Sequence, residues 1–129
     1  MVNGKLSEHK VYTSYYGKAC RELPSSMLIS ISRGTPDNFD GQFMRELNPS
    51  ESLLRNFKSG KITWEEYRKT YYLETLSKLN AYETFEKCKG KVLLCYCKEF
   101  EQCHRSLVLE WLANKLAGNI IGGEIHYER

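Results

Sequence analysis

The chain has 129 residues, 41% of them hydrophobic and 27% charged, and a formal net charge of +3. This length predicts a single domain, spanning residues 1–129, that builds its own core. The mild positive charge does not require a nucleic-acid partner. The longest apolar runs, such as VLLCY at 92–96, are too short to cross a bilayer, and no apolar signal segment follows the first lysine. We therefore expect a cytoplasmic protein with no membrane partner and no cofactor.

The first half of the chain predicts strands followed by helices. VYTSYY (11–16) and MLISIS (27–32) are β-branched and aromatic, which is typical of strands. Residues 33–47 read as a loop because glycine, proline, aspartate and asparagine are concentrated there. A helix should then begin with Asn48 as its N-cap and end at Gly60. The TWEE sequence at 63–66 predicts a capping box and a second helix that reaches about residue 80.

The second half predicts a strand, a helix and a further strand. KVLLCYC (91–97) reads as a buried strand, the apolar spacing of 107–116 as a helix capped by Gly118, and 120–127 as a last strand. Such βαβ units have parallel strands. The chain therefore predicts an α/β fold, a Rossmann-like three-layer sandwich with a small, mostly parallel sheet of about four strands. The alternative is a mixed α+β sheet.

Two polar loops should meet at one edge of this sheet, because ligands of parallel α/β sheets bind beyond the carboxyl ends of the strands. One loop follows the second strand, and the other follows the strand at 91–97 and opens a helix, whose first amides attract anions. An arginine in each loop suits phosphate or carboxylate. The predicted anion-binding residues are Ser32, Arg33, Gly34, Arg105 and Ser106.

The cysteine-rich stretch CYCKEFEQCHR (95–105) allows several kinds of chemistry. A cysteine near a helix N-terminus, a histidine and an arginine could be a nucleophile, so Cys103, His104 and Cys95 are the candidate catalytic residues. His104 would act as a general acid or base, because the unperturbed pKa of histidine lies near neutrality. The arginine spacing of cysteine phosphatases is absent. A Cys97–Cys103 disulfide remains open, and so does a purely structural role in the core.

A zinc site formed by these residues is the alternative that their spacing weighs against. The stretch lacks a CxxC knuckle. We expect Cys95 and Cys97 to point to opposite faces of the strand, and the adjacent Cys103 and His104 to diverge. The prediction is therefore no bound metal, with a Cys/His metal-binding protein as an alternative function. Cys20 and Cys88 are interpreted as structural or incidental, and Trp64 and Trp111 as core residues.

Three blocks of the sequence resemble a bacterial and phage family, the domain of unknown function 488. They are ISRGTPDNF (31–39), LNPSESLLRNFKSGKITWEEYRKTYY (47–72) and LLCYCKEFEQCHRSLVLEWL (93–112). The resemblance spans roughly residues 10–127, and its most specific part is a strand ending in LLC followed by a CHR that opens a helix. It implies a small cytosolic α/β domain without an established reaction. Cys95, Cys103, His104 and Arg105 match the family pattern, whereas Cys97 stands where many members carry an acidic residue.

These observations predict an enzyme that acts on a phosphorylated or nucleotide-like small molecule at the strand ends. The alternative is a non-catalytic module that binds a nucleotide or nucleic acid, which the lysines and tyrosines would serve. The expected partner is therefore a small anionic or nucleotide-like ligand, with nucleic acid as a less supported one.

Overall fold

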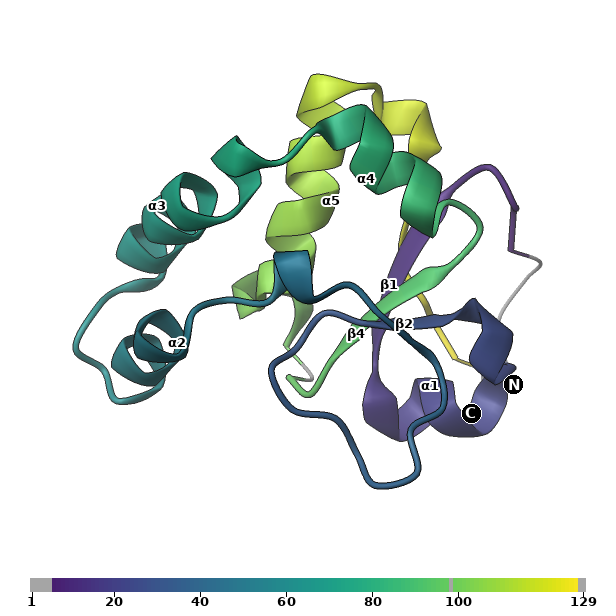
Figure 1. The fold of residues 1–129 in the computed structure, drawn as a ribbon, viewed down its shortest axis with the longest axis horizontal. Helices are drawn as coiled ribbons and strands as arrows, with labels where there is room; N and C mark the ends of the chain where they lie inside the picture. Colours follow the sequence, from purple (N-terminus) through teal and green to yellow (C-terminus); the bar gives the residue numbers. More distant parts are fainter. Residues whose placement is uncertain (1–5, 98, 128–129) are drawn as a thin grey trace.

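The computed structural model describes residues 6–97 and 99–127. Its strands are β1 (Val11–Tyr15), β2 (Leu28–Ser30), β3 (Gln42–Phe43), β4 (Val92–Cys95) and β5 (Ile121–Glu124). Its α-helices are α1 (Tyr16–Glu22), α2 (Glu51–Lys58), α3 (Trp64–Glu74), α4 (Ala81–Cys88) and α5 (His104–Lys115) (Figure 1). None of these helices has the length and apolar character needed to cross a bilayer.

The strands form one sheet in the order β3-β2-β4-β1-β5, and every pair is parallel. The predicted parallel α/β fold is thus confirmed, and the alternative α+β sheet is not formed. The sheet has five strands rather than about four. The additional strand is β3, a two-residue edge strand inside the predicted loop 33–47, which is too short to leave a periodic pattern.

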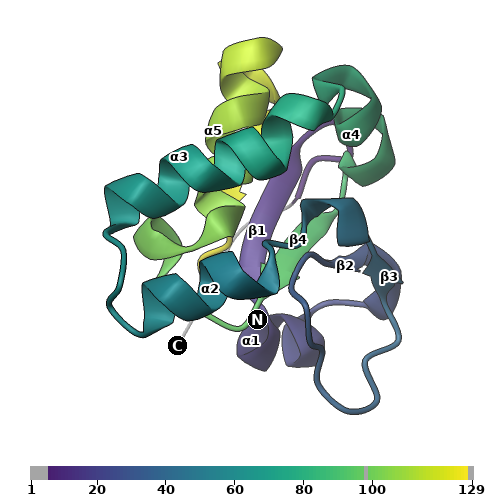
Figure 2. The same ribbon diagram turned by 60° about the vertical axis from the view of Figure 1, so that its left-hand side comes forward.

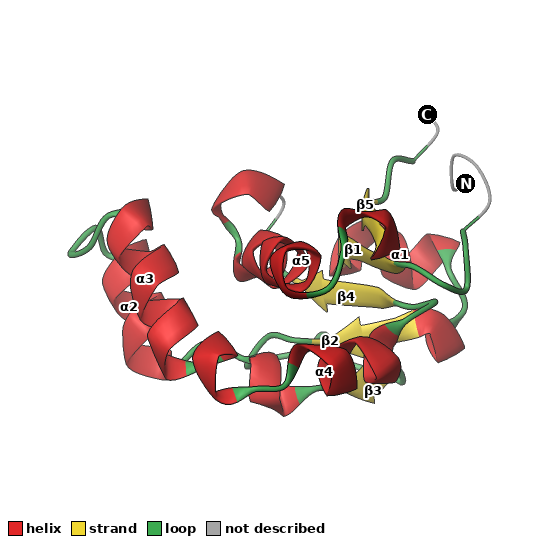
Figure 3. Ribbon diagram, turned by 90° about the horizontal axis from the view of Figure 1, so that it is seen from above, coloured by secondary structure: helices red, strands yellow, loops and turns green. Residues whose placement is uncertain are grey.

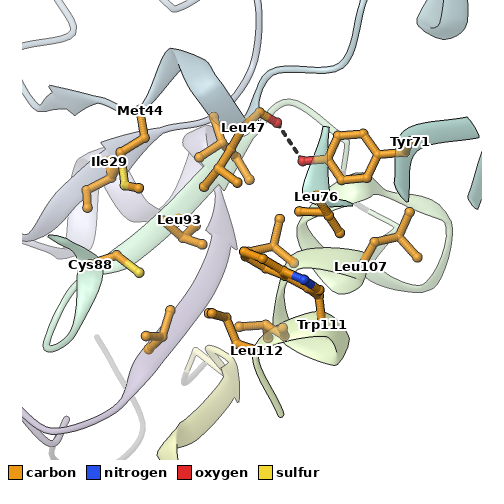
Figure 4. Close-up of a cluster of buried hydrophobic side chains, with 14 of the residues drawn as sticks. Ile29, Met44, Leu47, Tyr71, Leu76, Cys88, Leu93, Leu107, Trp111 and Leu112 are labelled. Atoms are coloured by element: carbon orange, nitrogen blue, oxygen red, sulfur yellow. Dashed lines mark hydrogen bonds between the residues drawn. The ribbon is translucent and has the colours of Figure 1, made fainter. Parts of the chain in front are cut away.

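The two faces of the sheet carry separate parts of the core. In β4, Leu93 packs with residues of α3, α4 and α5, whereas Val92 and Leu94 pack with Tyr16 and Ala19 of α1. This alternation is the two-residue period of a strand buried on both faces. Helices therefore cover both sides of the sheet, in agreement with a Rossmann-like sandwich (Figure 3). The larger cluster includes Trp111, which confirms its predicted core role (Figure 4).

The connections of β2 and β4 diverge at the centre of the sheet. From β2 the chain continues to β3 at one edge, and from its neighbour β4 it continues to β5 at the opposite edge. In open α/β sheets, a crevice for ligands forms at such a point, outside the carboxyl ends of the two strands. The topology thus directs attention to the segments that follow Ser30 and Cys95.

Helix α2 begins later than the sequence suggests. Ser50, not Asn48, is the N-cap, and its Oγ accepts a hydrogen bond from the Leu53 N–H at 3.2 Å. The prediction for Asn48 was wrong because two side chains in this turn are suitable caps and only the tertiary position selects one. The predicted end is confirmed, since Gly60 follows the C-cap with φ 82°, a conformation that glycine adopts readily.

The capping box at Thr63 is confirmed, with both reciprocal hydrogen bonds to Glu66 present. Helix α3 nevertheless ends at Glu74 rather than near residue 80, and Asn80 caps the separate helix α4. Apolar residues continue at helical spacing from α3 into α4, so the sequence pattern shows no sign that the helix ends between them. Gly118 is likewise not the C-cap of α5, which is Leu116.

Helices α2 and α3 form a hairpin that lies beside the carboxyl ends of the strands (Figure 2). The buried Tyr71 of α3 holds this hairpin to the segment before α2, because its hydroxyl donates to the Leu47 carbonyl at 2.6 Å (Figure 4). Aromatic rings continue from the hairpin into the sheet edge. Tyr71 contacts Tyr67 on one side and the His104 ring on the other, with centroids 6.3 and 5.6 Å away.

Replacing Tyr71 by Phe should loosen this attachment. The Leu47 carbonyl would lose its buried donor, so we expect the free energy of unfolding to fall by about 1–3 kcal/mol. Tyr72→Phe is the matched control, since the Tyr72 side chain is 42% exposed and makes no hydrogen bond to the described residues. Urea denaturation followed by far-UV circular dichroism measures both. Equal stability of the two variants would contradict the proposed role of the hydroxyl.

Candidate functional site

A pocket of about 310 Å³ opens at the point where β2 and β4 diverge. We call it the strand-end pocket. Its walls come from the ends of the two strands, the start of α5 and the α2–α3 hairpin. The lining residues are Ser32, Arg33, Gly34, Pro49, Leu54, Phe57, Lys58, Tyr67, Cys95, Tyr96, Cys97, Gln102, Cys103 and His104. The two predicted loops therefore meet at one site.

Cys95, Cys103 and His104 form the floor of this pocket, and we call them the floor cluster. Their side chains are 2%, 5% and 5% exposed. One ligand-type atom from each, two sulfurs and a ring nitrogen, lie within 4.8 Å of one another. The sequence-based expectation that Cys103 and His104 diverge was therefore wrong. Cys103 is the extended N-cap of α5 and His104 its first helical residue, and the change of backbone direction turns both side chains inward.

The two cysteines of the floor cluster approach each other from different elements. Cys95 ends β4 and Cys103 begins α5, and the structure pairs their sulfur atoms as a disulfide. Their Cα atoms lie 8.0 Å apart, beyond the 4.4–6.8 Å usual for disulfides. The alternative Cys97–Cys103 disulfide is not formed, and Cys97 is a free cysteine.

Cys97 lies on the same pocket as Cys95, contrary to expectation. Both residues line it, although β4 ends at Cys95 and Cys97 follows in the loop. Cys97 is exposed, however, and its Sγ is 3.5 Å from the Glu99 carbonyl oxygen. It therefore lines the wall of the pocket, whereas Cys95 lies in the floor cluster.

His104 is fixed in one tautomer by the end of β2. Its Nε2 lies 2.7 Å from the Ile31 carbonyl oxygen and donates to it, which leaves Nδ1 without a proton and 3.7 Å from the Cys103 Sγ. Burial lowers the pKa of His104 to about 4, assisted by the Arg105 charge. The imidazole is therefore neutral at pH 7, and the sequence-based expectation of a pKa near neutrality is not met. What His104 presents to its neighbours is a fixed nitrogen lone pair.

Arg105 is completely buried and forks onto Glu124 at the end of β5. Its Nε and Nη2 donate to the two carboxylate oxygens at 3.0 and 2.8 Å, and its Nη1 donates to the Cys95 Sγ at 3.0 Å and to the Cys97 carbonyl at 2.6 Å. Its guanidinium thus holds the floor cluster from behind and does not line the pocket. Glu124 was missed by the sequence reasoning, because no local spacing connects positions 105 and 124.

Of the other predicted anion-binding residues, three lie at the pocket and one does not. Ser32, Arg33 and Gly34 line it, and the Ser32 Oγ donates to the Gly34 carbonyl at 2.6 Å. Arg33 is exposed and forms no ion pair with any described residue. Ser106 lies outside the pocket lining, and its Oγ donates to the Cys103 carbonyl at 2.8 Å.

The α2–α3 hairpin supplies wall residues that the sequence reasoning missed. Lys58 adds a second cation, and Phe57 and Tyr67 add two aromatic residues to a lining that also includes Tyr96, which is 55% exposed. Their helical spacing was interpreted only as an apolar face. Cys88 is buried in the core, where burial raises the pKa of its thiol to about 12, which confirms a structural role.

Comparison with protein families places the chain in a family. The family model described as the Active DUF488-N3 subclade matches residues 14–116, which is most of the chain and includes every residue that lines the strand-end pocket. No curated protein and no solved structure matches the chain.

Glu124→Gln should destabilise the protein strongly, because the buried Arg105 would lose its compensating charge. Breaking such a pair from one side costs on the order of 3 kcal/mol, even with the Glu124 side chain 19% exposed. Glu110→Gln is the control, since its pair with Arg68 is largely exposed and should contribute less than about 1 kcal/mol. Urea denaturation of both variants tests this. A loss in E124Q no larger than in E110Q would contradict the assignment.

Proposed function

The chain belongs to the domain of unknown function 488 family, and we propose that it is an enzyme acting on a phosphorylated or nucleotide-like small molecule in the strand-end pocket. One observation carries this proposal. The floor cluster brings two sulfurs and a neutral imidazole together at the bottom of a pocket, at the place in the sheet where α/β proteins bind ligands. Reactive side chains that converge in such a crevice are typical of active sites.

The rim of the pocket favours an anionic group on the ligand. Arg33 and Lys58 both line it, one from the loop after β2 and the other from the end of α2. Neither forms an ion pair with a described residue, so both charges are available to a ligand. An arginine fork and a lysine point charge both bind phosphate well.

The walls of the pocket favour a flat apolar group on the same ligand. Phe57 and Tyr96 line the pocket with ring surface, and the buried Tyr67 packs against the Phe57 ring. Aromatic rings stack on bases and sugars as readily as on one another. A molecule with a ring at one end and a phosphate at the other, as in a mononucleotide, complements both features.

The surroundings of the floor cluster place positive groups beside its sulfur atoms. Arg105 donates a charge-assisted hydrogen bond to the Cys95 Sγ, and Cys103 lies at the positive end of α5. Thiolates in such surroundings are the reactive form of cysteine. We therefore assign Cys95, Cys103 and His104 together as the reactive group at the bottom of the pocket.

Ligand binding should depend on the rim cations. Arg33→Ala and Lys58→Ala each remove a charged hydrogen-bond donor, so we expect the Kd for adenosine 5′-monophosphate to rise about 10- to 100-fold. Isothermal titration calorimetry measures this, with inorganic phosphate and adenosine as separate probes of the two halves. Arg55→Ala is the control, because Arg55 also lies on α2 but pairs with Glu51 outside the pocket. Unchanged affinity in both rim variants would refute the assigned anion site.

Chemical conversion of the bound ligand should require the floor cluster, in addition to the rim cations that bind the ligand. Cys95→Ser and Cys103→Ser should retain nucleotide binding within about 3-fold and lose conversion, because serine preserves shape but is a poor anion at neutral pH. A mixture of nucleotides and sugar phosphates, followed by mass spectrometry, provides the assay, and Cys20→Ser is the control. Binding without conversion by the wild-type chain would instead favour the non-catalytic module.

A further inference from the structure

The floor cluster has the composition and shape of a metal site with one open position. Its ligand-type atoms are the sulfurs of Cys95 and Cys103 and the Nδ1 of His104, all within 4.8 Å of one another. Sulfur and imidazole nitrogen are the ligands that zinc prefers, and three protein ligands with a fourth open position are typical of catalytic zinc. Once the Cys95–Cys103 pair is reduced, both sulfurs and the imidazole nitrogen can serve one ion as ligands.

The imidazole is already prepared for coordination. Its Nε2 hydrogen bond to the Ile31 carbonyl, at 2.7 Å, places the lone pair on Nδ1, which faces the Cys103 sulfur. Metal-binding histidines commonly donate their other ring N–H to a carbonyl or carboxylate in this way. A role as proton carrier would not require so rigid and buried a ring, whereas a metal ligand benefits from both.

The cysteines are supported in the same manner. Arg105 donates to the Cys95 sulfur and is itself held by the Glu124 carboxylate. Hydrogen bonds to a coordinated thiolate fix its direction and offset its charge. Two thiolates also neutralise a divalent cation, so the loaded centre can lie in buried surroundings without a net charge.

We propose that Cys95, Cys103 and His104 bind one zinc ion whose open position faces the strand-end pocket. The identity of the substrate is taken from the proposed function, on which this inference rests. Among the reactions of such a substrate, a zinc-bound water favours hydrolysis. Zinc lowers the pKa of a bound water to about 7. Water would add across one bond of the ligand, with its hydroxyl going to the phosphorus or carbon centre and its proton to the leaving group. No external oxidant or reductant is needed.

Metal content of the full chain, purified without a histidine tag and with a non-thiol reductant, tests this directly. We expect about one zinc per chain by plasma mass spectrometry. Cys95→Ser, Cys103→Ser and His104→Gln should each lose most of it, while Cys97→Ser and Cys88→Ser should retain it. Retention of full zinc by the three floor variants, or its absence from the folded wild-type chain, would overturn the proposal.

Cobalt substitution provides a second readout that does not depend on activity or on the folding of the variants. Wild-type protein stripped with a chelator and reloaded with Co²⁺ should show the thiolate-to-cobalt absorption of a tetrahedral site. Addition of adenosine 5′-monophosphate should shift this spectrum if the open position faces the pocket. A colourless Co²⁺ mixture would overturn the zinc site but leave nucleotide binding through Arg33 intact. Loss of nucleotide binding with the colour retained would instead refute the proposed ligand.

Discussion

The buried fork between Arg105 and Glu124 is the interaction on which the rest of the site depends. It joins the first turn of α5 to the end of β5, across 19 positions of the chain. Burying a guanidinium without a partner lowers the stability of the fold. In Arg105 the Nε, Nη1 and Nη2 atoms each donate to an acceptor. Because its Nη1 also reaches Cys95 and the Cys97 carbonyl, one side chain fixes the helix start, the β5 edge and the end of β4 together.

A second constraint fixes the opposite side of the floor cluster. The hydrogen bond from His104 to the Ile31 carbonyl connects the start of α5 to the residue after β2. The start of α5 is therefore anchored to the end of β2 as well as to the ends of β4 and β5. Tyr71 packs against the His104 ring and connects it to the α2–α3 hairpin. The hairpin thus serves both as a wall of the pocket and as a support for its floor. Mutations in the hairpin should therefore affect the site even where they touch no ligand.

Local patterns in the sequence were sufficient for most secondary structure. The strand at β4, the capping box at Thr63 and the glycine at position 60 depend on neighbouring residues only, and the structure confirms them. The break between α3 and α4 was not predictable in the same way, because apolar residues continue at helical spacing through it. The two-residue β3 exists only because β2 offers it a pairing edge, which is a property of the assembled sheet.

For the site, the sequence by itself determined which residue types gather at the carboxyl ends of the strands, because βαβ topology follows from local patterns and brings those loops to one edge. It also singled out Cys95, Cys103 and His104 as candidate site residues. Only the tertiary structure decided how these residues relate. Whether Cys103 and His104 converge depends on the change of backbone direction at the start of α5, and the role of Arg105 depends on a carboxylate from another strand. Directions and long-range partners are set by packing, which no local spacing encodes.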